Sequence, residues 1–588
     1  MKTDASTNPK ATLNKGNAAT TAILSRVIAT SVDTRLPLTA PHGIAVTVFA
    51  DRFTEPHSPL RMLRALIIEL VAGLLPAVVA AQGPPQPTSS TPSLLVFITV
   101  DQMRPDYFTR FESQLTDGLA RLYRGGAVFT NAFQDHGITE TAPGHAATMS
   151  GRFPRSTGIV QNSTGVEDPT APVIGGGAPG ASPKRFRGTT LIDWLQKTDP
   201  RSRALSVSRK DRGAILPVAR NKQSVFWYTG TGNFSTSTYY ADTLPTWVRQ
   251  FNARRIPAQS AGKVWTLLLP EDQYPEPDDV QQENAGRGGV TFPHGAPPDS
   301  AQAAAVFPAF PWMDDLTLQF ALDGLQSMKL GNGPQTDILA ISLSTTDAVG
   351  HAFGPDSREL HDQIIRLDRY LGTFFDSLYK LRDSTRVIVA FTSDHGMAPY
   401  PGIKSRDPNA GAGFVHAALD TAWAAEARVA AALKDSSQFI WDTPFLLVNR
   451  SALKAKGLSP DSVVAAFVAA ERKIPGVFRV DLMRDLARAD TTKDAIARRW
   501  LHMAPPDLPV EAVVTLRPYD YWVPGIATHG TPHDYDAHVP VVFYGAPFKP
   551  GKYDEFARVV DMAPTLAAVL NTQPLERLDG HILRSALR

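Results

Sequence analysis

Four apolar runs stand out along the chain because polar residues hardly interrupt them. Such runs are typical of parallel strands that are buried on both faces of a sheet. They are LLVFITV at 94–100, RALSVS at 203–208, DILAISL at 337–343 and RVIVAFTS at 386–393, and they lead to Asp101, Lys210, Asp347 and Asp394, respectively. In an open α/β sheet, ligands bind beyond the carboxyl ends of the strands, so these charged residues are candidates for a single site.

Between the strands, the apolar positions follow a helical period. The clearest stripe repeats at alternating intervals of four and three residues, which places its members on one face of a helix. Its members are Leu360, Ile364, Leu367, Leu371, Phe374, Leu378 and Leu381. Strands that alternate with such helices predict an α/β fold with a mainly parallel central sheet and helices on both faces.

Two stretches lack this regularity, and we predict that they are inserted cap segments. The first covers about 213–330, and its part at 271–310 is rich in proline and glycine, which favours a loop over the site. The second covers about 411–500, where helix and strand signals are weak. One catalytic domain with these insertions would cover 93–588.

The composition narrows the chemistry. The chain has 588 residues, of which 43% are hydrophobic, which is enough for one large core. Its net charge of +2 and the lack of a basic tract give no reason to expect nucleic acid as a partner. It contains no cysteine, which excludes disulfides, thiolate metal sites and cysteine nucleophiles. A metal ion would have to bind histidine, carboxylate or hydroxyl oxygen.

The segment RMLRALIIELVAGLLPAVVAAQG at 61–83 resembles a secretory signal peptide, because two arginines precede an apolar run that ends in small residues. We predict a signal peptide at 62–81, followed by a linker at 82–92. Residues 1–61 would be a disordered extension or a start-site artefact. Glu69 and Pro76 make the run a poor membrane span, and a buried helix is the alternative. The prediction implies a periplasmic or secreted protein.

The stretch TETAPGHAATMSG at 139–151 predicts the start of a helix, with Thr141 and Pro143 in the positions that favour one. Taken alone, Thr141 is either the cap of this helix or a nucleophile.

Four stretches contain potential metal ligands: VDQMRPD, TTDAVGHAFGP, TSDHGM and THGTPHDYDAHVPVVFYG. Each is a weak signal by itself, but all four lie at or near predicted strand ends in one chain. Histidine nitrogen together with carboxylate oxygen suits zinc better than magnesium or calcium, which prefer oxygen ligands.

These motifs, together with TETAPGHAATMSGRFPRSTGI and SVSRKDRGAILP, occur in an order that resembles the alkaline phosphatase superfamily. Within it, the chain is most similar to the type I phosphodiesterase/nucleotide pyrophosphatase branch, and especially to its phosphate-irrepressible alkaline phosphatases. The resemblance extends over roughly 93–588 and implies an alkaline-phosphatase-like α/β fold.

The resemblance also implies two Zn²⁺ ions in one active site. The ligands of one ion would be Asp347, His351 and His529, and those of the other would be Asp101, Asp394, His395 and Thr141. His529 is preferred to His533 and His538 because His-Gly directly precedes the Tyr-Asp and the closing strand in the similar motif. Thr141 would be the nucleophile that forms a phosphothreonine, because a metal ion can stabilise its alkoxide. The first helical N–H groups would face the phosphate.

The motif SVSRKDRGAILP bears on the substrate class. Lys210 and Arg212 follow a strand and would bind the oxygens of a phosphate monoester, and the resemblance associates this element with monoesterases. A solvated surface pair is the alternative. By the same resemblance, Asn162 in GIVQNSTG is similarly placed to an asparagine that donates to a phosphate oxygen. His145, one turn after Thr141, is expected to pack within its helix.

The favoured function is therefore hydrolysis of small phosphate monoesters by a secreted zinc enzyme. The alternatives are a phosphodiesterase or nucleotide pyrophosphatase on the same fold, a sulfatase, and an inactive metal-binding surface protein. A sulfatase usually needs a cysteine-derived nucleophile, which this chain lacks.

Overall fold

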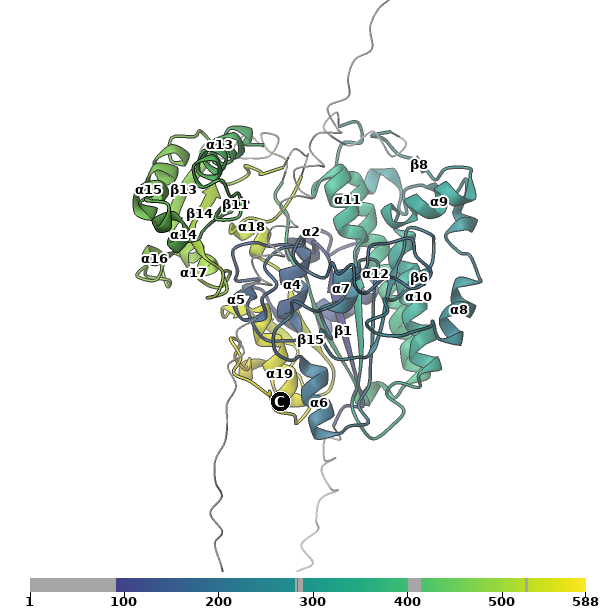
Figure 1. Cartoon of the computed structure of the whole chain (residues 1–588). Helices are drawn as coiled ribbons and strands as arrows, with labels where there is room; N and C mark the ends of the chain where they lie inside the picture. Colours follow the sequence, from purple (N-terminus) through teal and green to yellow (C-terminus); the bar gives the residue numbers. More distant parts are fainter. Residues whose placement is uncertain (1–90, 281–282, 284–288, 400–413, 524–526) are drawn as a thin grey trace, which may run out of the picture. The chain divides into compact units, whose positions relative to one another are not determined.

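The structure is a computed structural model that describes residues 91–280, 283, 289–399, 414–523 and 527–588 (Figure 1). The predicted extension at 1–61, the signal peptide at 62–81 and most of the linker at 82–92 lie outside the described residues.

A nine-stranded sheet forms the centre of the chain, in the order β16-β2-β15-β10-β1-β9-β4-β5-β6. The five strands from β10 to β5 are parallel, and β15, β2 and β6 introduce antiparallel pairs. The strands are β1 (Leu94–Val100), β2 (Ala127–Phe129), β4 (Ala204–Ser208), β5 (Ser224–Tyr228), β6 (Phe234–Ser235), β9 (Asp337–Leu343), β10 (Val387–Thr392), β15 (Val541–Tyr544) and β16 (Gly551–Tyr553). The four apolar runs thus form β1, β4, β9 and β10, as predicted.

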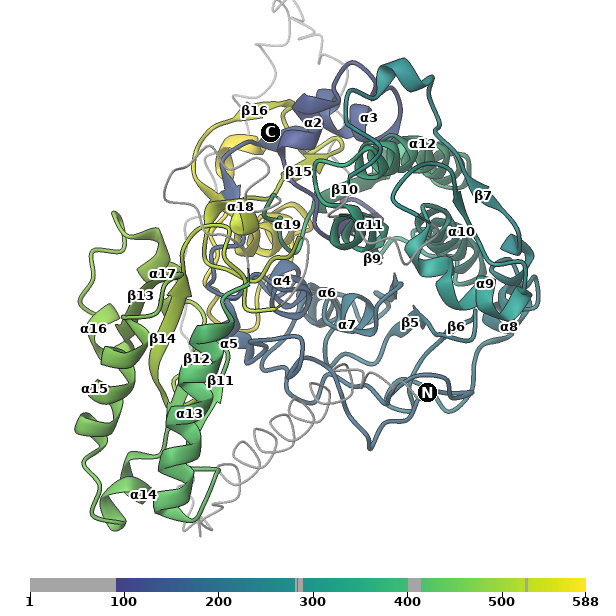
Figure 2. The ribbon, with the colours of Figure 1, turned by 90° about the horizontal axis from the view of Figure 1, so that it is seen from above.

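Helices cover both faces of this sheet (Figure 2). Alternate residues of β1 explain how, because Leu94 and Val96 belong to one buried core and Leu95 and Phe97 to the other. The first core contains side chains from α2 (Asp106–Arg110), α3 (Gly118–Gly125), α8 (Thr246–Asn252), α10 (Trp312–Ser327), α11 (Thr345–Phe353) and α12 (Arg358–Leu381). The second contains side chains from α4 (Thr141–Thr148), α6 (Leu191–Thr198), α7 (Asp211–Ile215) and α19 (Met562–Val569).

The predicted apolar stripe is the buried face of α12. Its members pack in the first core, and only Leu381, at the end of the helix, is partly buried. Ser357 caps this helix by accepting a hydrogen bond from the backbone N–H of Leu360.

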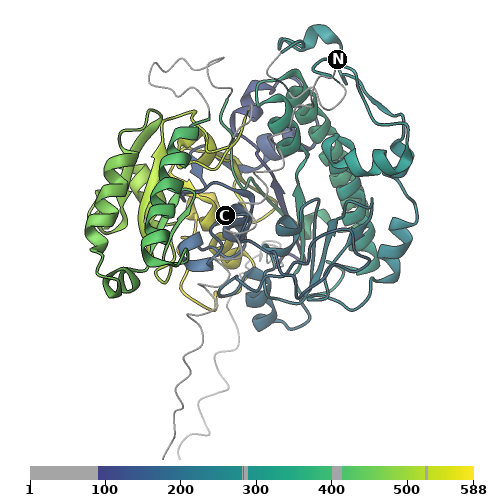
Figure 3. The ribbon, with the colours of Figure 1, turned by 45° about the horizontal axis from the view of Figure 1, so that its top comes forward.

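A second, antiparallel sheet has the order β11-β12-β14-β13 (Figure 3). Its strands are β11 (Phe439–Asp442), β12 (Phe445–Val448), β13 (Val477–Leu482) and β14 (Val510–Leu516). Side chains of α13 (His416–Leu433), α14 (Arg450–Ala455) and α15 (Pro460–Glu471) share its core, and α16 (Met483–Leu486) and α17 (Ala495–Leu501) follow β13. The predicted second insertion falls largely in this unit, whose sheet continues to Leu516.

The segment at about 213–330, which we predict to be an insertion, contributes β5 and β6 to the central sheet. Its remaining elements are short apart from α10, and they include β7 (Val264–Trp265), β8 (His294–Gly295) and α9 (Ser300–Val306). Other short elements are β3 (Ala132–Phe133), α5 (Pro154–Thr157), α18 (Asp534–Ala537) and β17 (Ala557–Arg558). Within the described ranges, we find no helix of the length and apolarity that a membrane span requires.

Candidate active site

The predicted site residues converge at one edge of the central sheet. The neighbouring strands β10, β1, β9 and β4 are parallel, so their carboxyl ends lie side by side. Asp394, Asp101, Asp347 and Lys210 follow these four strands, respectively. The sheet order therefore brings together residues that lie far apart in the sequence.

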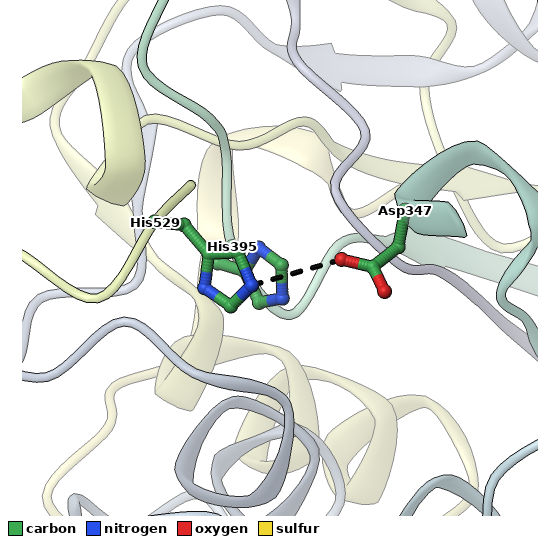
Figure 4. Close-up of side chains that lie close together, drawn as sticks. All are labelled: Asp347, His395 and His529. Carbon is green, nitrogen blue, oxygen red and sulfur yellow. Dashed lines mark ion pairs between the residues drawn. The ribbon is translucent and has the colours of Figure 1, made fainter. Parts of the chain in front are cut away.

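A first group of potential metal ligands consists of Asp347, His395 and His529, each of which offers a ligand atom within 4.8 Å of the others (Figure 4). The rings of His395 and His529 stack with their centroids 3.5 Å apart. Asp347 Oδ1 lies 3.6 Å from His529 Nε2. The same oxygen lies 3.2 Å from Nε2 of His351, one turn later on α11, so His351 borders this group.

Backbone carbonyls orient all three of these histidines. The Nδ1 atoms of His351, His395 and His529 lie 3.0, 2.9 and 2.8 Å from the carbonyl oxygens of Ala527, Gly396 and Thr139, respectively. A carbonyl oxygen can only accept, so Nδ1 carries the proton in each ring. In the neutral form, each Nε2 then presents a lone pair, which is how histidine binds a metal ion.

A second group consists of Asp101, Asp394 and His145, all of which are fully buried. His145 Nε2 lies 3.6 Å from Asp101 Oδ1, and its Nδ1 lies 3.3 Å from Asp394 Oδ2. The expected member of this group was His395, whose Nε2 lies 3.5 Å from Asp394 Oδ2. His395 is therefore close to the carboxylates of both groups.

His145 has contacts that fit its expected place in the helix. Its Nδ1 donates to the Thr141 carbonyl at 2.9 Å, and its Nε2 lies 3.0 Å from Ser342 Oγ. The two carboxylates beside it raise its pKa against the effect of burial. Both ring nitrogens of His145 already have partners, so His145 more simply orients Asp101 and Asp394 than binds a metal ion.

The donor set fits divalent metal ions. Asp394 Oδ2 and His395 Nε2 are buried and form no hydrogen bond with any described residue. Such atoms are costly to bury unless another partner binds them. Burial lowers the pKa of His395 to about 4, and burial with two neighbouring histidines holds the pKa of His529 well below its usual value. Both rings are thus neutral near pH 7, as metal binding requires.

Thr141 is the first residue of α4 and is 1% exposed. The N-cap position belongs to Glu140, and the Thr141 hydroxyl oxygen accepts from Lys210 Nζ at 3.3 Å. We expected the first helical N–H groups to face a phosphate, but residues 142 and 143 have no N–H that is free to donate to one. The Ala142 N–H already donates to Asn162 Oδ1 at 2.8 Å, and Pro143 has no N–H.

Lys210 connects the nucleophile candidate to both groups of ligands. Its Nζ lies 2.6 Å from Asp101 Oδ2 and 2.7 Å from Asp347 Oδ2, and its side chain is 9% exposed. Arg212, the second residue of α7, has no such role, because its ion pair among the described residues is with Asp211 at 3.6 Å. Its Nε is buried and forms no hydrogen bond with any described residue. The guanidinium therefore has one donor that no described residue uses.

His533 and His538 make other bonds. His533 Nε2 lies 2.9 Å from the Leu516 carbonyl oxygen, and His538 Nε2 lies 2.9 Å from that of Thr130. Neither belongs to a potential metal-binding group among the described residues.

Two supporting residues went unnoticed in the sequence. Gln102 donates from its backbone N–H to Asp394 Oδ1 at 3.1 Å and from Nε2 to Asp347 Oδ1 at 2.9 Å, so it bridges both groups. Asp314 accepts from the Thr345 N–H and hydroxyl at the start of α11, which carries Asp347. Gln102 lies inside the VDQMRPD motif and has a positive φ of 65°, but neither of its partners is close in sequence.

Comparisons with known proteins agree with this geometry. Residues 95–482 match the family model of type I phosphodiesterases/nucleotide pyrophosphatases. The chain belongs to this family. It is 32% identical to alkaline phosphatase PhoV of Synechococcus elongatus, over 85% of this chain and 94% of PhoV. It is 30% identical to alkaline phosphatase PafA of Elizabethkingia meningoseptica, over 82% and 92% of the two chains.

The solved structure of PafA also has this fold. The crystal structure of PafA superposes on this chain with a TM-score of 0.76 at 28% sequence identity. The match covers 85% of this chain and 99% of PafA. The large, mostly parallel sheet with helices on both sides is thus the PafA-like alkaline phosphatase fold, and the chain is an enzyme of this group.

Proposed function

We propose that this enzyme hydrolyses small phosphate monoesters through a phosphothreonine at Thr141 and releases inorganic phosphate. The observation that carries the proposal is the position of Lys210 Nζ, which lies within 3.3 Å of the Thr141 hydroxyl and closer still to carboxylates of both ligand groups. A nucleophile, a cation and two groups of potential metal ligands thus meet at one point.

Two Zn²⁺ ions would be held by Asp347, His351 and His529 on one side and by Asp101, Asp394, His395 and Thr141 on the other. When bound, the ions would supply positive charge that lowers the pKa of the threonine hydroxyl and stabilises the attacking and leaving oxygens. Histidine nitrogen with carboxylate oxygen supports zinc over magnesium or calcium.

The chain's own residues define each step. The Thr141 Oγ–phosphorus bond forms as the ester phosphorus–oxygen bond breaks, and the departing oxygen keeps the electron pair and is protonated by water. The Thr141 hydroxyl proton passes to the hydroxide that water leaves when it protonates the departing oxygen, and Lys210 stabilises the Thr141 oxygen. Water then attacks phosphorus from the other side as the Oγ–phosphorus bond breaks, and the proton that this water loses restores the Thr141 hydroxyl through solvent. This second step regenerates Thr141 and releases phosphate.

Three groups would bind the non-bridging phosphate oxygens: Lys210, Arg212 and the Asn162 amide. A monoester presents more charge and one more unsubstituted oxygen than a diester, so two cations and an amide donor favour the monoester. The buried Nε of Arg212, which has no hydrogen-bond partner among the described residues, supports this assignment.

The test compares p-nitrophenyl phosphate with bis-p-nitrophenyl phosphate for zinc-loaded protein that begins at Gln82. We expect the wild type to prefer the monoester. The Lys210→Ala/Arg212→Ala double variant should lose most of this preference, and the exposed Lys222→Ala is the matched control. Zinc content is measured in each variant because Lys210 contacts two proposed ligands. A preference for the diester that is the same in the wild type and in the Lys210→Ala/Arg212→Ala double variant would favour a phosphodiesterase or nucleotide pyrophosphatase.

The covalent step has its own test. Wild type and Thr141→Ser quenched in acid during turnover should carry one phosphoryl group at residue 141 by mass spectrometry, and Thr141→Ala should carry none and turn over no substrate. Full zinc content without turnover in the wild type would instead indicate an inactive metal-binding protein.

We also propose that the enzyme is exported to the periplasm or beyond. The support is the sequence pattern at 61–83, which lies outside the described residues. Fractionation of cells that express the full chain, with sequencing of the mature N-terminus, tests this proposal. A cytoplasmic product that retains 62–81 would contradict it.

A further inference from the structure

Asn162 lies outside any helix or strand, although its side-chain amide is proposed to donate to the phosphate. It lies between α5 and α6 in irregular backbone, and its side chain is partly exposed. Its Oδ1 accepts the Ala142 N–H at 2.8 Å, and its Nδ2 donates to no described residue. The amide therefore presents its N–H groups only if the backbone of residue 162 stays in place.

One side chain fixes that backbone. Glu140 Oε2 accepts the backbone N–H of Asn162 at 2.6 Å. Glu140 directly precedes Thr141, and Ala142, which binds the other end of Asn162, directly follows it. The two bonds thus attach Asn162 to the chain on both sides of the proposed nucleophile. Of these two bonds, the one from Glu140 fixes the backbone that carries the Asn162 side chain, and the one to Ala142 orients its amide.

Neighbouring contacts support the loop without replacing this bond. Gln161 Nε2 donates to the Thr443 carbonyl at 2.9 Å, between β11 and β12, and Ser163 Oγ donates to Gln161 Oε1 at 3.1 Å. Gly165 packs against Ala142, where an added Cβ would meet the alanine Cβ at 3.0 Å. The Asn162 carbonyl also accepts the Gly165 N–H at 3.1 Å. Among the described residues, however, only Glu140 binds the Asn162 N–H.

We propose that Glu140 is a positioning residue that holds Asn162 so that its amide donates to the phosphate of the substrate. The inference rests on the proposed function, because it assigns Glu140 to the phosphate-binding group named there. Glu140 acts through Asn162 and contacts neither the phosphate nor the metal ligands in this account. Its contribution should therefore disappear when the Asn162 amide is absent.

A double-mutant cycle tests this dependence with zinc-loaded full-length enzyme. It compares wild type, Glu140→Ala, Asn162→Ala and the double variant by kcat/KM for p-nitrophenyl phosphate and by the affinity for inorganic phosphate in calorimetry. Glu140→Gln is the conservative variant, because its amide oxygen can still accept the Asn162 N–H. Glu167→Ala is the matched control, since Glu167 is exposed in the same loop. Thermal melting confirms that each variant is folded.

We expect Glu140→Ala to lower kcat/KM and phosphate affinity about tenfold, as the loss of one charged hydrogen bond predicts. Glu140→Gln should retain most of both, and the double variant should resemble Asn162→Ala. Three results would overturn the proposal. The kcat/KM losses of Glu140→Ala and Asn162→Ala could multiply in the double variant, which would show that the two residues act independently. Alternatively, Glu140→Gln could lose as much kcat/KM and phosphate affinity as Glu140→Ala, or Glu140→Ala could match the wild type in both. If the wild type binds phosphate but hydrolyses no monoester, the proposed function fails, and the calorimetric cycle alone decides the role of Glu140.

Discussion

Asp314 offers a quantitative test of how the site is supported. It is fully buried and accepts from the Thr345 N–H at 3.2 Å, the Thr345 hydroxyl at 2.8 Å and Gln363 Nε2 at 2.9 Å. These bonds anchor the start of α11, which carries Asp347. Burial outweighs them and raises the pKa of Asp314 from 3.8 to about 6.

The sign of the effect follows from linkage. The folded state binds the Asp314 proton more tightly than the unfolded state, so the protein loses stability as the pH rises from 3.8 through 6. Above pH 6 the loss is complete. A difference of about two pKa units corresponds to about 3 kcal/mol of unfolding free energy. Ionisation of Asp314 therefore lowers the unfolding free energy at neutral and alkaline pH.

Asp314→Asn removes this cost and keeps the bonds. Its carbonyl oxygen can still accept from Thr345, and its new NH₂ can donate to Gln363 if that amide rotates, since Gln363 Oε1 is buried without a hydrogen bond to any described residue. We expect Asp314→Asn to raise the unfolding free energy by about 3 kcal/mol at pH 8 and by about half that at pH 5. Asp314→Ala leaves the donors unpaired and should lie at least about 3 kcal/mol below Asp314→Asn at both pH values.

Urea unfolding followed by tryptophan fluorescence measures both differences, and activity shows whether α11 keeps its place. Asp314→Asn should retain turnover. A gain of equal size at pH 5 and pH 8 would refute the reasoning, because the effect would then not arise from the charge. An Asp314→Asn less stable than the wild type at pH 8 would refute it as well.

Three further predictions concern other parts of the structure. Gly350→Ala should lower kcat/KM about tenfold, because its Cβ would meet Gln102 Oε1 at 1.8 Å and displace the amide that orients Asp347; unchanged kinetics would show that Gln102 is dispensable. Burial lowers the pKa of His136 to about 3, so the unfolding free energy falls as the pH drops below 6.5. In urea titrations, His136→Leu should lose about 2 kcal/mol less unfolding free energy between pH 7 and pH 5 than the wild type. An equal decrease in both proteins would exclude His136 as the cause. Chelation should abolish turnover, and added zinc should restore it. In metal analysis, His529→Ala should bind less zinc than His538→Ala, and equal zinc content in the two variants would exclude His529 as a zinc ligand.

The strands and the stripe of α12 could be predicted from the sequence because their signals are local. A buried strand shows in seven consecutive residues, such as those of β1 and β9. A helix face shows in a period that repeats within one element. The second sheet was harder to foresee, because β13 is only partly buried along most of its length. The apolar runs of β11 and β12 are only three and four residues long.

The contacts that orient the site could not be predicted in the same way. The Gln102 N–H reaches Asp394 across 292 residues, and His529 Nδ1 reaches the Thr139 carbonyl across 390. No local pattern encodes such pairs, because they depend on strand order and loop paths. For the same reason, the sequence could name the candidate ligands but could not foresee that His145 would lie between Asp101 and Asp394.

The helix start at Thr141 explains why a cap and a nucleophile look alike in sequence. A cap must satisfy backbone N–H groups, but at α4 other residues do this work. Glu140 occupies the N-cap position, but its side chain makes no cap hydrogen bond to the helix. Asn162 accepts the Ala142 N–H from twenty residues further along the chain, and Pro143 has no N–H to satisfy. The Thr141 hydroxyl is thereby left to meet Lys210. The residue that releases threonine from capping is thus the one proposed to bind the phosphate, so the helix start and the catalytic site are built from the same contacts.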